Sequence, residues 1–133
     1  MFSHVTLGVR DLGAAGVFYD SVLASLGLVR RRVDPDGGPR ALCWIHPDVM
    51  LPRFYVYEPF NGSPATAGNG TMVAFEAPTK AAVDRAYNAA VANGGSDEGP
   101  PGPRPRYGDG YYGAYFRDPD GNKLHVVYRG DLR

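Results

Sequence analysis

The amino-acid sequence predicts an α+β fold made of two tandem βαβββ modules, in which a strand and a helix are followed by three more strands. Three observations lead to this fold class. A segment of alternating apolar residues is followed by a helical pattern near the N-terminus, and this order recurs after residue 70. The same spacing separates His4 from Met72 and Leu12 from Lys80, which indicates an internal duplication. The length of 133 residues is typical of one domain.

We therefore expect a single domain over residues 1–133, with one module over about 1–60, a linker over 61–70 and a second module over about 71–133. In the first module, apolar residues at every second position predict a strand over Ser3–Val9. Asp11 is a typical N-cap for a helix that its apolar stripe places over about Leu12–Leu26. Three further strands are expected at Leu28–Asp34, Ala41–His46 and Arg53–Glu58.

The second module repeats this order. A strand is predicted over Thr71–Ala77, and Thr79 is the expected N-cap of a helix that ends near Asn93. The proline-rich segment Gly99–Pro105 is expected to be a loop outside the sheet, because proline cannot donate a backbone hydrogen bond. The last two strands are predicted at Tyr111–Arg117 and Lys123–Arg129, joined by an Asp-Pro-Asp-Gly turn.

The amino-acid composition limits which binding partners and which cellular compartment we expect for this protein. The chain has 14 basic and 14 acidic residues, so it lacks the positive charge that a nucleic-acid-binding surface requires. A neutral chain is compatible with a homo-oligomer. There is no apolar run long enough to cross a membrane and no signal-peptide pattern at the start. The single cysteine, Cys43, cannot form an internal disulfide and alternates with apolar residues. We therefore expect a cytoplasmic protein that binds neither nucleic acid nor membranes, with Cys43 buried.

Three segments carry a resemblance to a known family. They are SHVTLGVRDL with FYDSVLASLGL at the start, GTMVAFEAP before the second helix, and YYGAYFRDPDGNKLHVV at the end. The DPDGN turn between two strands is the most specific of these features. Over its whole length the chain resembles the vicinal oxygen chelate superfamily, which includes lactoylglutathione lyases, extradiol dioxygenases and bleomycin-resistance proteins. The resemblance implies a curved, cup-shaped mixed sheet with the helices on the outside, and a homodimer.

In metal-using members of this family the ligands point into the cup from strands of both modules. Matching motif to motif places the four ligand positions on His4, Tyr55, Met72 and His125. Only His4 and His125 are candidate metal ligands, because a thioether and a neutral phenol bind divalent metals poorly. Glu76 is on the same strand face as Met72 and is a further oxygen donor. The residues leave open whether a divalent metal is the cofactor.

The expected pocket is lined by His4, Tyr55, Met72, Glu76, Tyr112 and His125. Within it, His125 and Glu76 are the candidate catalytic residues, since an imidazole serves as a base near neutral pH. Arg104 and Arg106, in the loop before the last hairpin, are candidates to hold a substrate carboxylate, with a solvated loop as the alternative. The pocket is expected within one chain or across a dimer interface.

The resemblance implies a small-molecule-binding protein of the glyoxalase, bleomycin-resistance or dioxygenase type. One hypothesis is a lyase or dioxygenase that acts on a compound with adjacent oxygens, with a metal bound to those oxygens. The alternative is a non-catalytic sequestering or resistance protein with a metal-free pocket, which the residues at the Tyr55 and Met72 positions favour. A metal-free lyase or isomerase with His125 as base lies between the two.

Overall fold

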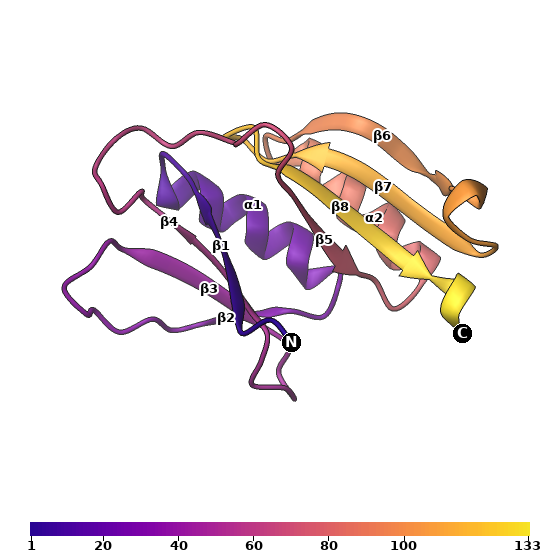
Figure 1. Ribbon diagram of the computed structural model, residues 1–133, viewed down its shortest axis with the longest axis horizontal. Coiled ribbons are helices and arrows are strands. Elements are labelled where there is room, and N and C mark those ends of the chain that lie inside the picture. Colours follow the sequence, from indigo (N-terminus) through magenta and orange to yellow (C-terminus); the bar gives the residue numbers. More distant parts are fainter.

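The computed structural model describes all 133 residues, and it shows the same order of elements twice (Figure 1). The first module contains β1 (His4–Gly8), α1 (Leu12–Ala24), β2 (Val29–Arg31), β3 (Ala41–Ile45) and β4 (Arg53–Tyr57). The second contains β5 (Met72–Glu76), α2 (Lys80–Ala92), β6 (Ser96–Pro103), β7 (Tyr111–Arg117) and β8 (Lys123–Arg129). Short 3₁₀ helices cover Pro105–Tyr107 and Gly130–Leu132. The predicted α+β class with two βαβββ modules is confirmed.

Each module forms its own four-stranded mixed sheet, and the two sheets have equivalent strand orders. The orders are β1-β4-β3-β2 and β5-β8-β7-β6. In each sheet the first strand runs parallel to the last, and the remaining neighbours are antiparallel. The edge strands β1 and β5 therefore occupy equivalent places, and neither pairs with the other.

The proline-rich segment corrects the prediction of a loop. Residues 99–103 belong to β6, which pairs with β7 through shifted registers between Asp97 and Gly99 and between Gly99 and Gly102. An edge strand pairs on one side only, so its prolines need not donate to a neighbour. At the register shifts, residues that cannot take part in the regular hydrogen bonding between β6 and β7 are left out of the pairing. Edge location is a tertiary property, which the local sequence does not show.

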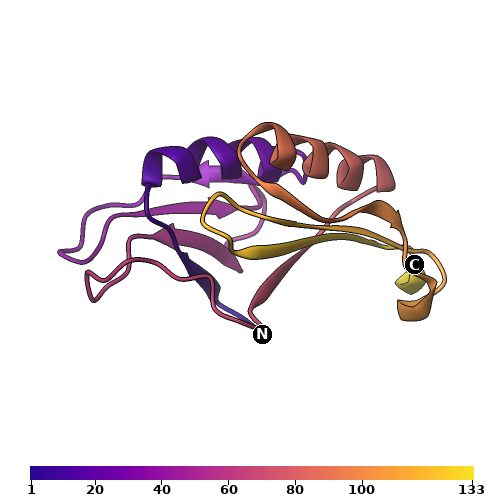
Figure 2. The same ribbon diagram turned by 90° about the horizontal axis from the view of Figure 1, so that it is seen from above.

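Both helices lie on one side of the sheets (Figure 2). Each begins where a polar side chain accepts a backbone N–H: the Asp11 carboxylate from Ala14 at 3.2 Å, and the Thr79 hydroxyl from Ala82 at 3.0 Å. A single core of 20 buried residues joins the helices and the inner faces of both sheets. The two sheets slope away from each other on either side of β1 and β5, so their outer faces diverge (Figure 2). Neither helix has the length and hydropathy of a membrane span.

The DPDGN turn connects the two modules. The buried Asp118 carboxylate accepts hydrogen bonds from the Tyr19 hydroxyl of α1 at 2.6 Å and from the backbone N–H of Asn122 at 2.9 Å. The Asn122 amide in turn donates to the carbonyl of Gly8, at the end of β1, at 2.9 Å. The most specific motif of the sequence is therefore a structural connection between modules rather than part of a pocket.

Candidate functional site

His125 lies on the outer face of the second sheet, and its hydrogen bonds fix its tautomer. The side chain is almost fully buried. Nδ1 lies 2.8 Å from the carbonyl oxygen of Ala114, which can only accept, so Nδ1 carries the proton. Nε2 of the neutral ring then accepts the hydroxyl hydrogen of Tyr111 at 2.7 Å. Both ring nitrogens are thus engaged within the protein.

Neighbours on β7 enclose the imidazole. The Tyr115 ring stacks on it at a centroid distance of 4.0 Å and an angle of 10°. A Cβ atom at Gly113 would lie only 2.6 Å from Cε1 of His125, so a glycine is needed for the ring to cross the strand. Burial lowers the pKa of His125 below 6.5, and the positive charges of Arg104 and Lys123 act in the same direction.

Tyr112 is a correction to the predicted pocket. Its hydroxyl donates to the Asp84 carboxylate of α2 at 2.7 Å, so the side chain points to the helix side of the sheet. Tyr111 and Tyr115 occupy the outer face in its place, beside His125. The signal was present in the sequence, since Tyr112 shares its strand face with the buried Ala114 and Phe116.

Met72 and Glu76 lie on the outer side of β5, the edge strand beside β8. The Met72 side chain is 42% exposed. The Glu76 side chain is 61% exposed, and its carboxylate forms an ion pair with Arg133 at 3.1 Å. The Glu76 carboxylate is therefore solvent-exposed and already paired with a guanidinium.

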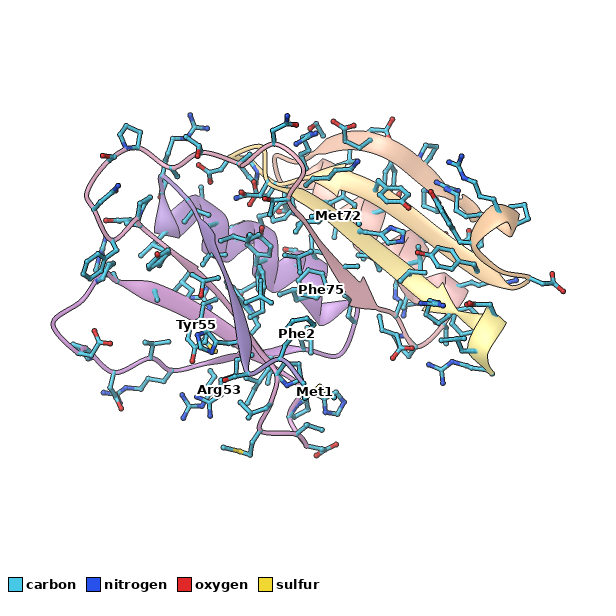
Figure 3. All side chains as sticks on the ribbon, viewed as in Figure 1. Met1, Phe2, Arg53, Tyr55, Met72 and Phe75 are labelled. Atoms are coloured by element: carbon cyan, nitrogen blue, oxygen red, sulfur yellow. The ribbon has the colours of Figure 1, made fainter.

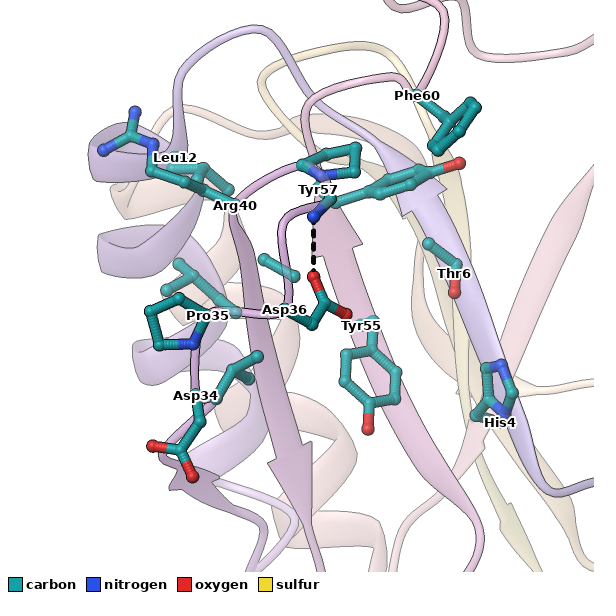
Figure 4. Close-up of a pocket in the computed structure, with 15 residues that line it drawn as sticks. His4, Thr6, Leu12, Asp34, Pro35, Asp36, Arg40, Tyr55, Tyr57 and Phe60 are labelled. Carbon is teal, nitrogen blue, oxygen red and sulfur yellow. Dashed lines mark hydrogen bonds between the residues drawn. The ribbon is translucent and has the colours of Figure 1, made fainter.

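His4 and Tyr55 belong to a separate cavity on the first sheet (Figure 4). They come from the adjacent strands β1 and β4, and their rings meet edge to face at a centroid distance of 5.6 Å. The cavity measures about 720 Å³, and the segment 33–40 forms one of its walls. Its aromatic lining includes Tyr57 and Phe60, and its charged lining includes Asp34, Asp36 and Arg40.

One chain does not bring all the predicted pocket residues together. Every residue that lines the cavity of His4 and Tyr55 comes from the first module. Met72, Glu76 and His125 are on the second sheet, whose outer face points elsewhere (Figures 2 and 3). Within a single chain the predicted pocket residues therefore fall into two separate groups, one on each sheet.

The donor set of one chain does not fit a divalent metal. No three side chains of the types His, Cys, Asp and Glu lie close enough together to hold an ion. His125 has no free ring nitrogen, because Nδ1 binds the carbonyl of Ala114 and Nε2 binds Tyr111. Met72 offers only a thioether, which is a soft ligand. We therefore derive no chemical step through a metal.

Comparisons with known proteins place the chain in a family. The family model described as the glyoxalase/bleomycin resistance protein/dioxygenase superfamily matches residues 1–126. A glyoxalase/bleomycin resistance protein from Albidiferax ferrireducens T118 is 38% identical, with a TM-score of 0.80 over 97% of this chain and 98% of that one. The fosfomycin resistance protein FosX from Mesorhizobium loti shares the fold at 18% identity, with a TM-score of 0.64 over 96% of this chain and 91% of that one.

A comparison with curated proteins finds no match. The family model spans both modules, and the 38% identical structure is matched over almost its full length. The predicted resemblance is thereby confirmed. The chain belongs to the glyoxalase/bleomycin resistance protein/dioxygenase superfamily.

Proposed function

We propose that this protein binds a small organic molecule without a metal, in a site that two copies of the chain form together. The proposal rests on two groups of residues that lie on diverging sheet faces: the cavity of His4 and Tyr55 on the first sheet, and the surroundings of His125 on the second. We call these the two half-sites. The cavity of His4 and Tyr55 is open and mixes apolar and aromatic side chains with a few polar and charged groups that could orient a small molecule. The face of His125 is lined with tyrosines and lies on the other sheet of the same chain.

A homodimer supplies the missing half of each site. In a symmetric dimer the first-module face of one copy lies opposite the second-module face of its partner, and symmetry creates two equivalent sites. Exposed apolar side chains at the diverging faces support this arrangement, among them Met72 at 42% and Phe60 at 80%. Because the net charge of the chain is zero, no overall electrostatic repulsion opposes the association of two copies. We place the protein in the cytoplasm, where its one buried, free cysteine stays reduced.

The donor chemistry favours sequestration over metal-dependent chemistry. Both imidazole nitrogens of His125 serve internal hydrogen bonds, and the Glu76 carboxylate is paired with Arg133. In our proposal these side chains serve to form the binding surface and to supply polar groups to it. The non-catalytic hypothesis therefore explains more of the geometry than a metal-bound oxygen substrate does.

A thermal-shift experiment tests this function. A panel of small organic compounds is added to the protein in EDTA, and a compound at about 100 times its Kd should add about 2.7 kcal/mol to the unfolding free energy. Tyr55→Ala and Tyr115→Ala alter the two half-sites, so each should remove the stabilisation by the same compound. Val91→Ala, at an exposed position of α2, is the control.

Two results would contradict the proposal. Stabilisation that requires Mn²⁺, Ni²⁺ or Zn²⁺ would show a metal site. A compound whose effect survives one of the two tyrosine variants would show that a single half-site suffices.

A second candidate function is metal-free proton transfer, as in a lyase or isomerase. The observation that favours it is the 2.7 Å hydrogen bond from the Tyr111 hydroxyl to the neutral His125 imidazole. In this arrangement Nε2 can accept the phenolic proton and return it, while the Tyr111 oxygen faces a bound compound.

Recovery of the ligand separates the two functions. After incubation with the protein, a stabilising compound is recovered and its mass and NMR spectrum are compared with those of the starting material. Sequestration predicts unchanged compound. Turnover that is lost in Tyr111→Phe, with ligand stabilisation retained, would instead establish proton transfer.

A further inference from the structure

The outer face of the second sheet carries a continuous tyrosine surface. The rings of Tyr107 and Tyr111 lie with their centroids 5.3 Å apart, and Tyr115 stacks on the other side of His125. Tyr107 is 51% exposed, so about half of its side chain is accessible to a ligand. Such a surface accepts an aromatic or flat apolar group with a favourable ring contact.

Three cations lie over this surface without a carboxylate partner. Arg104 and Lys123 lie 5.8 and 5.4 Å from the centre of the Tyr115 ring, and Arg106 lies 5.1 Å from that of Tyr107. None of the three forms a salt bridge, whereas seven other arginines do. Arg129, over the Tyr111 ring, is one of these seven and is neutralised by Asp131 at 2.7 Å.

Arg104 is held in place before any ligand arrives. Its guanidinium donates to the carbonyl oxygen of Pro100 at 2.8 Å. The missing side chain at Gly102 leaves room for it, because a Cβ atom there would lie 3.2 Å from a guanidinium nitrogen. A guanidinium has five N–H donors, so most of them remain available. Prior positioning lowers the entropy that binding costs.

We propose that this face binds the carboxylate of a small aromatic acid, held between Arg104 and Lys123, with the aromatic ring on Tyr107. The proposal rests on the proposed small-molecule-binding function and names its ligand class. The planar guanidinium matches a carboxylate through two parallel hydrogen bonds. Because the surface is made of tyrosine rings, we expect it to bind an anion that carries an aromatic ring more tightly than an inorganic anion.

Calorimetric titration with three probes tests the ligand class. Sodium benzoate carries both parts of the proposed ligand, benzamide has the same shape without the charge, and inorganic phosphate has charge without a ring. Benzoate should bind at least about tenfold more tightly than either of the other probes. Equal affinity for benzamide would exclude recognition of charge. Tighter binding of phosphate would exclude an aromatic acid as the preferred class.

Variants test the residues. Arg104→Gln and Lys123→Gln should each weaken benzoate binding about tenfold or more, because each removes a charge-assisted contact. Arg85→Gln is the matched control, since Arg85 is an exposed arginine of α2 without a salt bridge, on the helix side of the sheet. Unchanged benzoate binding in both variants would overturn the assignment.

The light-scattering mass of the same variants distinguishes a ligand from a partner chain. If Arg104→Gln and Lys123→Gln reduce a dimer to monomer, the cations serve acidic residues of a second copy, and the proposal is wrong. If benzoate fails to bind while neutral compounds of the panel still stabilise the protein, the anion proposal fails and the proposed function stands. If neither benzoate nor any neutral compound binds, both the anion proposal and the proposed function fail.

Discussion

At the scale of single residues, the environment of His125 decides what its imidazole can do. The His125 ring donates through Nδ1 to the carbonyl of Ala114 and accepts at Nε2 from the Tyr111 hydroxyl. The absence of a side chain at Gly113 lets this ring lie across β7, under Tyr115. The imidazole is thereby held neutral and oriented. Through Nε2 it also orients the Tyr111 hydroxyl.

The lowered pKa of His125 predicts a pH dependence of stability. Burial holds the folded-state pKa below 6.5, the value expected in the unfolded chain. The unfolded state therefore binds more protons between the two values, so the unfolding free energy falls as the pH is lowered from about 6.5 through the folded pKa. Above about pH 6.5 this contribution is complete and constant.

Urea denaturation between about pH 7 and pH 5 measures this dependence, above the range in which ordinary carboxylates titrate. His125→Phe should flatten the profile, while Val91→Ala, at an exposed position of α2, should keep the wild-type slope. A profile that is unchanged in His125→Phe would show that another group causes the pH dependence.

At the scale of elements, helix α1 and the DPDGN turn join the modules. Phe18 is fully buried and contacts Phe116 of β7 at a centroid distance of 6.4 Å, so one side chain of the first module packs in the second. The turn adds polar connections through Tyr19 and Asp118. Because the core is shared, we propose that residues 1–133 unfold as one domain in a single transition.

Phe18→Ala should reduce the unfolding free energy by about 3–5 kcal/mol, because it removes a large buried ring and leaves a cavity. Chemical denaturation provides the measurement. Val17→Ala, at the neighbouring helix position with 60% exposure, should cost well under about 1 kcal/mol. Similar losses for the two variants would contradict the assigned helix face.

Tyr19→Phe isolates the polar connection. It removes the 2.6 Å hydrogen bond to the buried Asp118 carboxylate without changing the ring, and should cost about 1–3 kcal/mol in urea denaturation. Tyr112→Phe deletes a similar bond to Asp84 at a half-exposed position, and should cost about 1 kcal/mol or less. If the two costs are equal, burial of Asp118 does not strengthen the connection.

At the scale of the whole molecule, diverging sheet faces leave each half-site open. The cavity of His4 and Tyr55 lies on one sheet, and His125 lies with Tyr111 and Tyr115 on the other. The strands β1 and β5 are both edge strands, each paired with a neighbour on one side only. A second copy of the chain with the same two faces is the simplest partner that closes both sites.

Light scattering at micromolar concentration should give twice the chain mass of 14.3 kDa. Ala74→Arg adds a charge at an exposed position on the outer face of β5, and should shift the mass toward one chain. Ala92→Arg, at the exposed end of α2, should leave the mass unchanged. A monomeric wild type would refute the proposed dimer, as would an Ala74→Arg variant that keeps the dimer mass.

The sequence by itself determined the family, the two modules and most elements. Local signals suffice for these features: period-two and helical patterns mark strands and helices, Asp11 and Thr79 cap the helices, and the DPDGN turn marks the last hairpin. Cys43 is buried as expected, but it lies opposite Tyr55 and outside the core cluster, while the neighbouring Trp44 belongs to the core.

Only the tertiary structure decided which residues share a site. The proline-rich segment became strand β6 because it lies at a sheet edge, where one-sided pairing tolerates proline. Tyr112 turned toward α2, and Tyr111 took its place, because the register of β7 against the core sets the face of each side chain. His4 on the edge strand β1 and His125 on the inner strand β8 belong to different sheets, and the packing of both modules around one helical core directs them apart. Such placement depends on contacts between distant segments, which no local pattern encodes.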